Sequence, residues 1–144
     1  MSNSSTVSKL DDLIGLRTAK RVVRSLIESK IESHSLLFYG QEGCGKDELA
    51  HLMAGFWLCN SPDHGGADGV CRACMALARG NNTDLLVIMP QGLGNMIVIW
   101  QFEPRPQHDE TLSLQEFLRT GPIFSRHKVV LSWGRQWTRG AERR

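Results

Sequence analysis

The sequence lacks a long hydrophobic run, a secretory leader and a strong net charge. Its longest apolar stretches are short, such as residues 85–90, whereas a membrane-spanning helix needs about 20 consecutive apolar residues. Residues 1–8 are polar and serine-rich, without the apolar segment that a signal peptide requires. A net charge of +2 provides no broad basic surface for nucleic acid. These absences predict a cytoplasmic protein that does not contact a membrane, with a disordered tail at 1–8.

The composition is sufficient for one folded domain. Of 144 residues, 41% are hydrophobic and 22% are charged, as is ordinary for a globular protein with its own core. The four cysteines would stay reduced in the cytoplasm. Metal binding or simple burial therefore explains them better than disulfide bonds.

Helix-like and strand-like apolar patterns alternate along the chain. Spacings of three and four residues, or short mixed segments, predict helices at about 18–32, from 49 to near 59, at 71–79 and at 112–119. Short apolar runs predict buried strands at 36–39, 85–89, 96–100 and 128–131. This alternation predicts an α/β fold with a mostly parallel sheet.

The glycine-rich segment 40–47 fits the phosphate-loop pattern G-x-x-x-x-G-K. Glycines let backbone N–H groups turn towards a phosphate, and the N-terminus of the following helix adds partial positive charge. Lys46 can reach the outer phosphates. The candidate nucleotide-binding residues are Gly40, Gly43, Cys44, Gly45, Lys46 and Asp47. The strand and helix expected on either side favour this interpretation over a glycine-rich turn with a surface lysine.

Asp47 departs from the motif, which has Ser or Thr at this position so that the hydroxyl can bind Mg²⁺. An aspartate could bind a metal through its carboxylate, but it also places a negative charge beside the phosphates. It could instead serve a purely structural role in the first turn of the helix. We therefore expect binding of ATP with Mg²⁺ to be weakened, and hydrolysis to be weakened further.

Three cysteines lie close together after the second predicted helix. Cys71 and Cys74 form a C-x-x-C pair, and Cys59 precedes them across a polar loop. A structural zinc ion needs four ligands, and either Asp68 or His64 is near enough in the sequence to be the fourth. The alternatives are buried or unused thiols, or a redox pair; no thioredoxin-like strand precedes the motif, which disfavours the redox pair.

Seven short segments match the motifs of one known family in the same order. They are L-I-G at 13–15, H-S-L-L-F at 34–38, K-D-E-L-A at 46–50, L-C at 58–59, D-G-V-C-R-A-C at 68–74, N-T-D-L at 82–85 and K-V-V-L at 128–131. Together they resemble the clamp-loader branch of the AAA+ ATPases, the delta-prime and gamma/tau subunits of bacterial DNA polymerase III. The phosphate loop followed by the cysteine module contributes most of the specificity.

The resemblance implies a P-loop NTPase domain of the AAA+ RecA-like type at 9–131, in incomplete form. Its parallel sheet with flanking helices would carry an inserted zinc module at 59–74. The positions that match the family's four zinc-binding cysteines are Cys59, Asp68, Cys71 and Cys74. The implied partners are other clamp-loader subunits, the sliding clamp and, through the complex, primer–template DNA. Both the delta-prime role and the gamma/tau role are compatible with these motifs.

The end of the sequence departs from this family. Ser132, Trp133 and Gly134 stand where members usually have an acidic pair that holds Mg²⁺. Residues 132–144 contain four arginines and two tryptophans without a helical or strand period. We expect this tail to result from a frameshift or a truncated gene, and the alternative is a real basic tail that contacts nucleic acid.

We therefore predict a delta-prime-like clamp-loader subunit with weak or absent ATP hydrolysis and no catalytic residue of its own. One alternative is a free-standing P-loop ATPase or kinase, which would need a hydroxyl and a second acidic group for Mg²⁺. Another is a small zinc-stabilised nucleic-acid module, which would need basic residues interleaved with aromatic ones. Only the tail has that composition.

Overall fold

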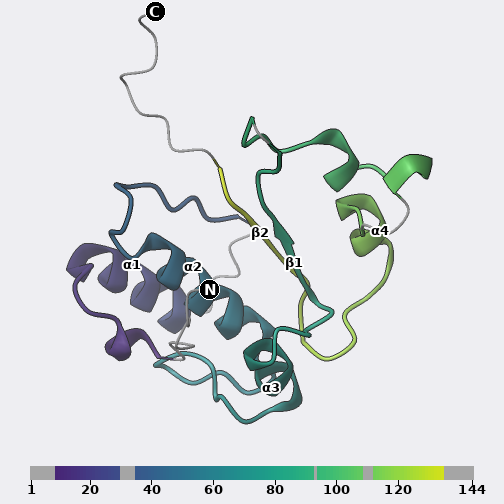
Figure 1. The fold of residues 1–144 in the computed structure, drawn as a ribbon. Helices are drawn as coiled ribbons and strands as arrows, with labels where there is room; N and C mark the ends of the chain where they lie inside the picture. Colours follow the sequence, from purple (N-terminus) through teal and green to yellow (C-terminus); the bar gives the residue numbers. More distant parts are fainter. Residues whose placement is uncertain (1–8, 30–34, 93, 109–111, 135–144) are drawn as a thin grey trace, which may run out of the picture. The chain divides into compact units, whose positions relative to one another are not determined.

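The computed structural model describes residues 9–29, 35–92, 94–108 and 112–134 (Figure 1). The helices are α1 (Arg17–Glu28), α2 (Lys46–Leu58), α3 (Arg72–Ala78) and α4 (Leu114–Arg119), and the strands are β1 (Leu85–Ile88) and β2 (Val129–Ser132). Short 3₁₀ turns occur at Leu10–Asp12, Ile99–Gln101 and Pro106–His108. The chain divides into two compact units, one made of Met1–Leu86 and Gly121–Leu131, the other of Val87–Thr120 and Ser132–Arg144. None of the described helices is long and apolar enough to cross a membrane.

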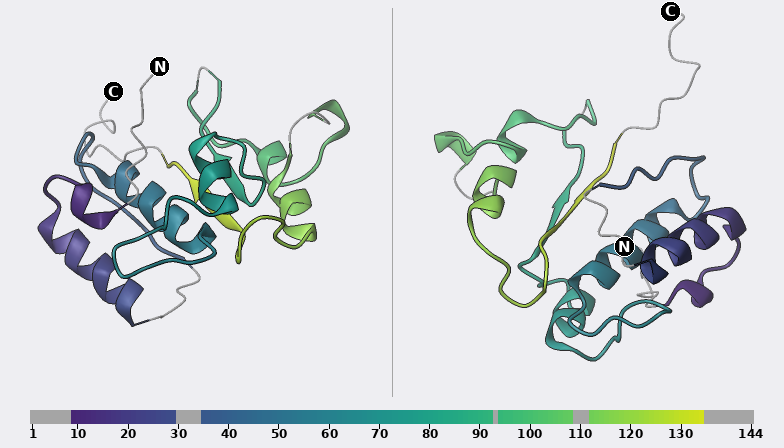
Figure 2. Two further views of the ribbon diagram at one scale, coloured as in Figure 1. Left: turned by 90° about the horizontal axis from the view of Figure 1, so that it is seen from below. Right: turned by 180° about the vertical axis from the view of Figure 1, so that it is seen from behind.

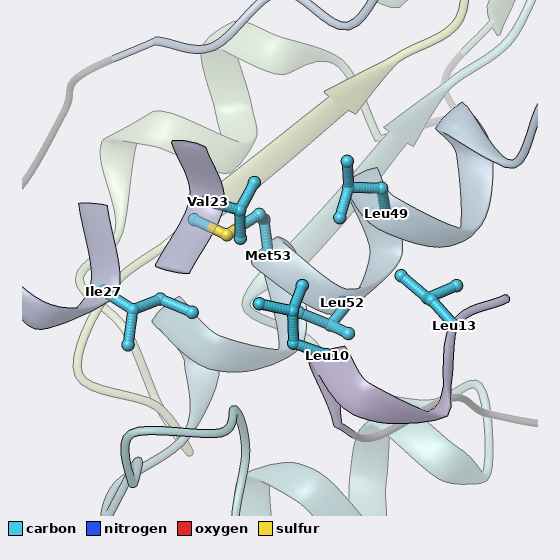
Figure 3. Close-up of a cluster of buried hydrophobic side chains, with 7 residues drawn as sticks. All are labelled: Leu10, Leu13, Val23, Ile27, Leu49, Leu52 and Met53. Atoms are coloured by element: carbon cyan, nitrogen blue, oxygen red, sulfur yellow. The ribbon is translucent and has the colours of Figure 1, made fainter. Parts of the chain in front are cut away.

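Helices α1 and α2 lie side by side in the first unit (Figure 2). Their facing sides, together with the turn before α1, form one hydrophobic cluster (Figure 3). Its buried members are Leu10, Leu13, Val23, Ile27, Leu49, Leu52 and Met53. The i, i+4 spacing of Val23 and Ile27 places both side chains on one face of α1. Burial of such a side chain contributes about 1.5–3 kcal/mol, so this cluster anchors α2 along its first turns.

The second half of α2 packs on a different set of residues. Ala54 and Leu58 are buried with Val129 of β2, and the half-buried side chains around them come from α2, α3 and both strands. Helix α2 therefore contacts α1 on one side and the strands on another. This position fixes both of its ends, which carry the two candidate sites described below.

Strands β1 and β2 form a two-stranded parallel sheet. The N–H of Val129 donates to the carbonyl of Asp84 at 2.9 Å, and the N–H of Trp133 donates to the carbonyl of Ile88 at 2.9 Å. Residue numbers rise together along both strands, as they do only in parallel pairing. The strands expected at 85–89 and 128–131, and the mixed α/β class, are confirmed. The full AAA+ architecture stays a prediction.

The strand expected at 36–39 is wrong, because the described chain has no strand pairing there. Leu36 and Phe38 pack against the first cluster, whereas Leu37 and Tyr39 are 86% and 89% exposed. Side chains that alternate in this way are typical of an extended segment with one buried face. A strand also needs a hydrogen-bonded neighbour, and within the described residues the sheet consists of β1 and β2 alone. The apolar run at 36–39 correctly indicated buried side chains, but it could not indicate whether another strand pairs with this segment.

The strand expected at 96–100 is also wrong. An isolated antiparallel bridge joins Gln91 and Met96, and the chain then enters the 3₁₀ turn Ile99–Gln101. The buried Gln101 side chain receives the N–H of Val98 at 3.0 Å and donates to the carbonyl of Met89 at 2.8 Å. These bonds to the backbone replace those that a neighbouring strand would have made.

The four expected helices are confirmed, with bounds that differ from the expected ones by up to four residues. Helix α1 ends at Glu28, and residues 30–32 of the expected segment lie outside the described residues. Helix α4 begins with a capping box, in which Ser113 accepts the N–H of Glu116 and its own N–H donates to the Glu116 carboxylate. The tail expected at 1–8 and residues 135–144 of the tail expected at 132–144 also lie outside the described residues, whereas Ser132 belongs to β2.

Candidate metal centre and phosphate loop

The three clustered cysteines are positioned by the ends of two helices. Cys59 is the C-cap of α2, where its N–H donates to the carbonyl of Gly55 at 2.9 Å. Cys71 is the N-cap of α3, and Cys74 lies in the first turn of that helix. Residues three apart at a helix start lie on the same side, so Cys71 and Cys74 both face Cys59. The helix boundaries thus create a three-sulfur cluster from segments that are 12 residues apart.

The loop between α2 and α3 packs closely against both helices. Ala67 is buried with Cys59 and Cys74 in a small cluster of its own. Opposite it lies Gly55, where an added Cβ would stand 3.9 Å from the Cβ of Ala67 and 3.4 Å from Cδ2 of Leu77. A small residue in α2 therefore lets the loop approach the helix, and this approach holds the cysteines together.

Asp68, and not His64, lies with the cysteines. The potential ligand atoms of Cys59, Asp68, Cys71 and Cys74 are all within 4.8 Å of one another. His64 is exposed in a tight turn closed by hydrogen bonds between Asp63 and Gly66. Of the two candidates for a fourth ligand, the structure brings the carboxylate into the cluster.

The spacing of the cluster suits a tetrahedral metal ion. Cys59 Sγ and Cys71 Sγ are 3.9 Å apart. Zinc–sulfur bonds of about 2.3 Å in a tetrahedron place two sulfurs about 3.8 Å apart. Thiolate sulfur and carboxylate oxygen are both ligands that zinc accepts. The residues present therefore fit a zinc ion.

Asp68 is held in an ionised state within this cluster. One of its carboxylate oxygens accepts the N–H groups of Val70 and Cys71, both at 3.0 Å. The bond from Cys71 is the largest cause that lowers the pKa of Asp68 to about 2, and Val70 and the nearby thiols add to it. Within the described part of the chain, no ion pair involves this carboxylate. A negative charge without a basic partner favours a cation at this place.

Burial favours the neutral form of two of the thiols. Burial raises the pKa of Cys59 and of Cys74. Burial acts in the same direction on Cys71, but hydrogen bonds with the backbone of Asn60 and Cys74 outweigh it, and its pKa is lowered. A metal ion binds the thiolate form and would supply the positive charge that this buried site lacks.

The phosphate loop retains its glycine geometry at the other end of α2. Gly43 and Gly45 have φ angles of +73° and +86°, in the left-handed region that side chains disfavour. Gly40 is favoured for a different reason, because an added Cβ would stand 3.0 Å from Sγ of Cys44, closer than an ordinary contact. Cys44 therefore fills space beside Gly40, as expected of a small apolar side chain.

The two charged residues of this loop differ in their surroundings. Lys46 is half-buried, and its Nζ donates to the carbonyl of Gln41 at 3.3 Å, so the ammonium group lies over the loop. Asp47 is exposed in the first turn of α2, where the helix dipole favours an acidic side chain. The nucleotide-binding roles of residues 40–47 stay a prediction.

Comparison with known proteins identifies the family. A sequence model of the family described as "DNA polymerase III, delta subunit" matches residues 15–136. The chain belongs to this family. It is also similar to a protein named DNA polymerase III subunit delta' from Pseudomonas aeruginosa, with 42% identity over 59 residues, which are 41% of this chain and 18% of that protein.

A second relative, from Bacillus subtilis, has the same name. It is 35% identical over 79 residues, which are 54% of this chain and 23% of that protein. The chain thus spans less than a quarter of the length of each of these curated relatives. The family assignment rests on the match to residues 15–136. Because of the short coverage of the relatives, the activity of a whole subunit is a matter for proposal.

The sequence patterns did not indicate the residues that connect the candidate metal cluster to the rest of the first unit. Asn60, Arg72 and Asp84 each bond to the segment just before β2, and Asn82 bonds to the C-x-x-C turn. A buried aspartate before a strand has no periodic signal. The only sequence cue was that Asn and Asp often bond to nearby backbone groups in turns.

Proposed function

We propose that the chain is the nucleotide-binding part of a delta-prime-like clamp-loader subunit, which takes part in loading the sliding clamp on DNA during replication. The match of the delta-subunit family to residues 15–136 carries this proposal. The names of both relatives support it. The partners would be other clamp-loader subunits and the sliding clamp, with primer–template DNA bound through the complex.

ATP hydrolysis by this chain is weak or absent in our proposal. Gly43, Gly45 and Lys46 would hold the phosphates of ATP. Mg²⁺, when bound, neutralises charge on the transferred phosphoryl group, and it needs oxygen ligands at the loop and after a sheet strand. Asp47 replaces the hydroxyl ligand, and no acidic residue occurs at 132–134. The loop would then serve mainly as a structural or ATP-sensing element.

A zinc ion held by Cys59, Asp68, Cys71 and Cys74 forms the second part of the proposal. All four positions would be protein ligands, which is typical of a structural and not a catalytic site. The ion would join the end of α2 to the start of α3, and its binding energy would add to folding stability. The cluster of ligand atoms within 4.8 Å supports this role.

The decisive experiment for the clamp-loader role is reconstitution with purified partners. The 144-residue chain should co-elute with other clamp-loader subunits, and its own ATP turnover should stay at background. If the chain binds none of the other loader subunits, the clamp-loader role is contradicted. Mg²⁺-dependent turnover that disappears in Lys46→Ala would favour a free-standing ATPase instead. DNA binding without any partner would favour the small nucleic-acid module.

A further inference from the structure

Phe124, in the loop just before β2, is held by two residues that directly follow cysteines of the cluster. Asn60, which follows Cys59, donates from Nδ2 to the carbonyl of Phe124 at 2.9 Å. Arg72, which follows Cys71, places its guanidinium carbon 4.3 Å from the centre of the Phe124 ring. A cation over an aromatic face attracts it electrostatically. The two sides of the cysteine cluster therefore meet at a single residue of a distant loop.

The same loop is also held by hydrogen bonds to Asp84. The carboxylate of Asp84 accepts the N–H groups of Ile123 and Phe124 at 2.7 Å and that of Ser125 at 2.8 Å. The residue has no exposed surface. Hydrogen bonds to an ionised group are stronger than neutral ones, and three of them define the path of residues 123–125. The carbonyl of Asp84 also accepts the N–H of Val129, so the loop and the first bond of β2 share one anchor.

Asn82 joins this anchor to the cysteine module. Its Nδ2 donates to the carbonyl of Ala73, inside the C-x-x-C turn, at 2.9 Å. Its Oδ1 accepts the N–H of Asp84 at 2.9 Å. A chain of hydrogen bonds thus runs from between Cys71 and Cys74, through Asn82 and Asp84, to the loop 123–125.

Asn60 and Arg72 can both contact Phe124 only if Cys59 and Cys71 keep their relative positions. Asn60 belongs to the end of α2 and Arg72 to the start of α3, and the cluster joins these two segments. A metal ion would fix the sulfur atoms of both segments at one distance. Without it, the two segments are joined at the cluster by thiol contacts such as that between Cys59 Sγ and Cys71 Sγ. Thiols are weak hydrogen-bond donors and acceptors, so the two holders of Phe124 can separate.

We propose that metal occupancy of the cysteine cluster sets the position of the loop 123–125, and with it the start of β2, through Asn60 and Arg72. The two side chains are positioning residues: they touch the loop and not the ion. The inference rests on the proposed metal site. By thermodynamic reciprocity, a loop that is released from Asn60 and Arg72 must also lower the affinity for the metal.

The first experiment measures hydrogen exchange of the Ile123, Phe124 and Ser125 amides in the 144-residue chain, with zinc bound and after chelation. Chelation should speed exchange of these amides by about tenfold, and amides of α1 should change much less. In the double variant Asn60→Ala with Arg72→Ala, zinc should still bind. Its loop amides should exchange fast in both conditions. Arg79→Ala, which removes an exposed arginine at the other end of α3, is the matched control.

The second measurement is zinc affinity by competition with a chromogenic chelator, which remains informative even if the metal-free chain unfolds. The double variant should bind zinc about tenfold more weakly than the wild type and Arg79→Ala. Zinc that binds with equal affinity in the double variant, or loop exchange that ignores chelation, would overturn the inference and leave the metal site standing. A chain that binds no zinc would overturn both.

Discussion

The two ends of α2 lie at two different candidate sites, and each site contains an aspartate with the opposite consequence for binding. At the C-terminal end, Asp68 lies among three cysteine sulfurs in a cluster that favours a cation. At the N-terminal end, Asp47 lies in the first turn of α2, beside a loop whose glycines, together with the helix N-terminus, favour an anion. The carboxylate is therefore compatible with the first site and opposed to the second.

The contrast has a physical origin in what each site is made of. A metal centre is built from side-chain donors, and a carboxylate oxygen can replace a thiolate with a loss of affinity but not of charge. A phosphate loop is built mainly from backbone N–H groups, which survive any substitution that keeps the glycines. Such a loop can retain its shape, with Gly43 and Gly45 at positive φ, after a side chain has made it unfavourable for nucleotide.

The largest effect should come from removing a buried sulfur ligand. Cys74→Ser should release the metal and lower the free energy of unfolding by about 4 kcal/mol, if free zinc exceeds its Kd about 1,000-fold. Elemental analysis would measure metal per chain, and denaturant unfolding would measure stability. Cys44→Ser is the control, because that thiol lies in the phosphate loop outside the cluster. Equal metal content in both variants would contradict the metal centre.

A third aspartate, Asp84, lies outside both candidate sites and has a structural role. Asp84 is fully buried, and three backbone N–H groups bond to it. Burial acts to raise the pKa of this carboxyl, but these hydrogen bonds outweigh burial and lower it. Asp84→Asn should therefore cost about 2–3 kcal/mol of unfolding free energy at neutral pH, since two or more bonds to a charged acceptor are weakened.

The stabilisation by Asp84 should depend on pH, because the pKa of its carboxyl differs between the folded and unfolded states. The pKa of Asp84 is lower in the folded state than the unfolded value of about 3.9, so its contribution is complete above about pH 4. It is lost as the pH falls through the lowered folded pKa. The stability difference between wild type and Asp84→Asn should shrink below about pH 4, as measured by urea unfolding at several pH values. A difference that stays constant down to pH 2 would contradict this role.

The sequence predicted the parts of the molecule that depend on local pattern. The periodicity of residues such as Val23 and Ile27 located α1, and the C-x-x-C spacing identified two members of the cluster. Strand pairing was less predictable, because the apolar run 36–39 shows burial and cannot show which neighbour is present. The choice between Asp68 and His64 depended on the fold of a polar loop, and the contacts of Asp84 join residues about 40 positions apart.

A smaller effect should distinguish the two candidates for the fourth ligand. Asp68→Cys should tighten zinc binding by about 10- to 100-fold, because thiolate is a stronger zinc ligand than carboxylate. His64→Ala should leave affinity unchanged, since His64 is exposed in the turn at 63–66. Chelator competition gives both values. Weaker binding in His64→Ala, with no change in Asp68→Cys, would assign the fourth position to the histidine.

The smallest effect should occur at the phosphate loop, where one substitution tests whether the retained backbone is still functional. Asp47→Thr removes a negative charge from beside the expected phosphates and restores a hydroxyl for Mg²⁺. Asp47 is exposed, so water screens its charge, and we expect MgATP affinity to rise by about tenfold at most. Hydrolysis should remain at background, because no acidic residue is restored at 132–134. Titration calorimetry of Asp47→Thr, with Asp47→Thr/Lys46→Ala as the control, measures the gain. No gain over wild type would mean that the loop keeps the shape of a phosphate site without its binding capacity.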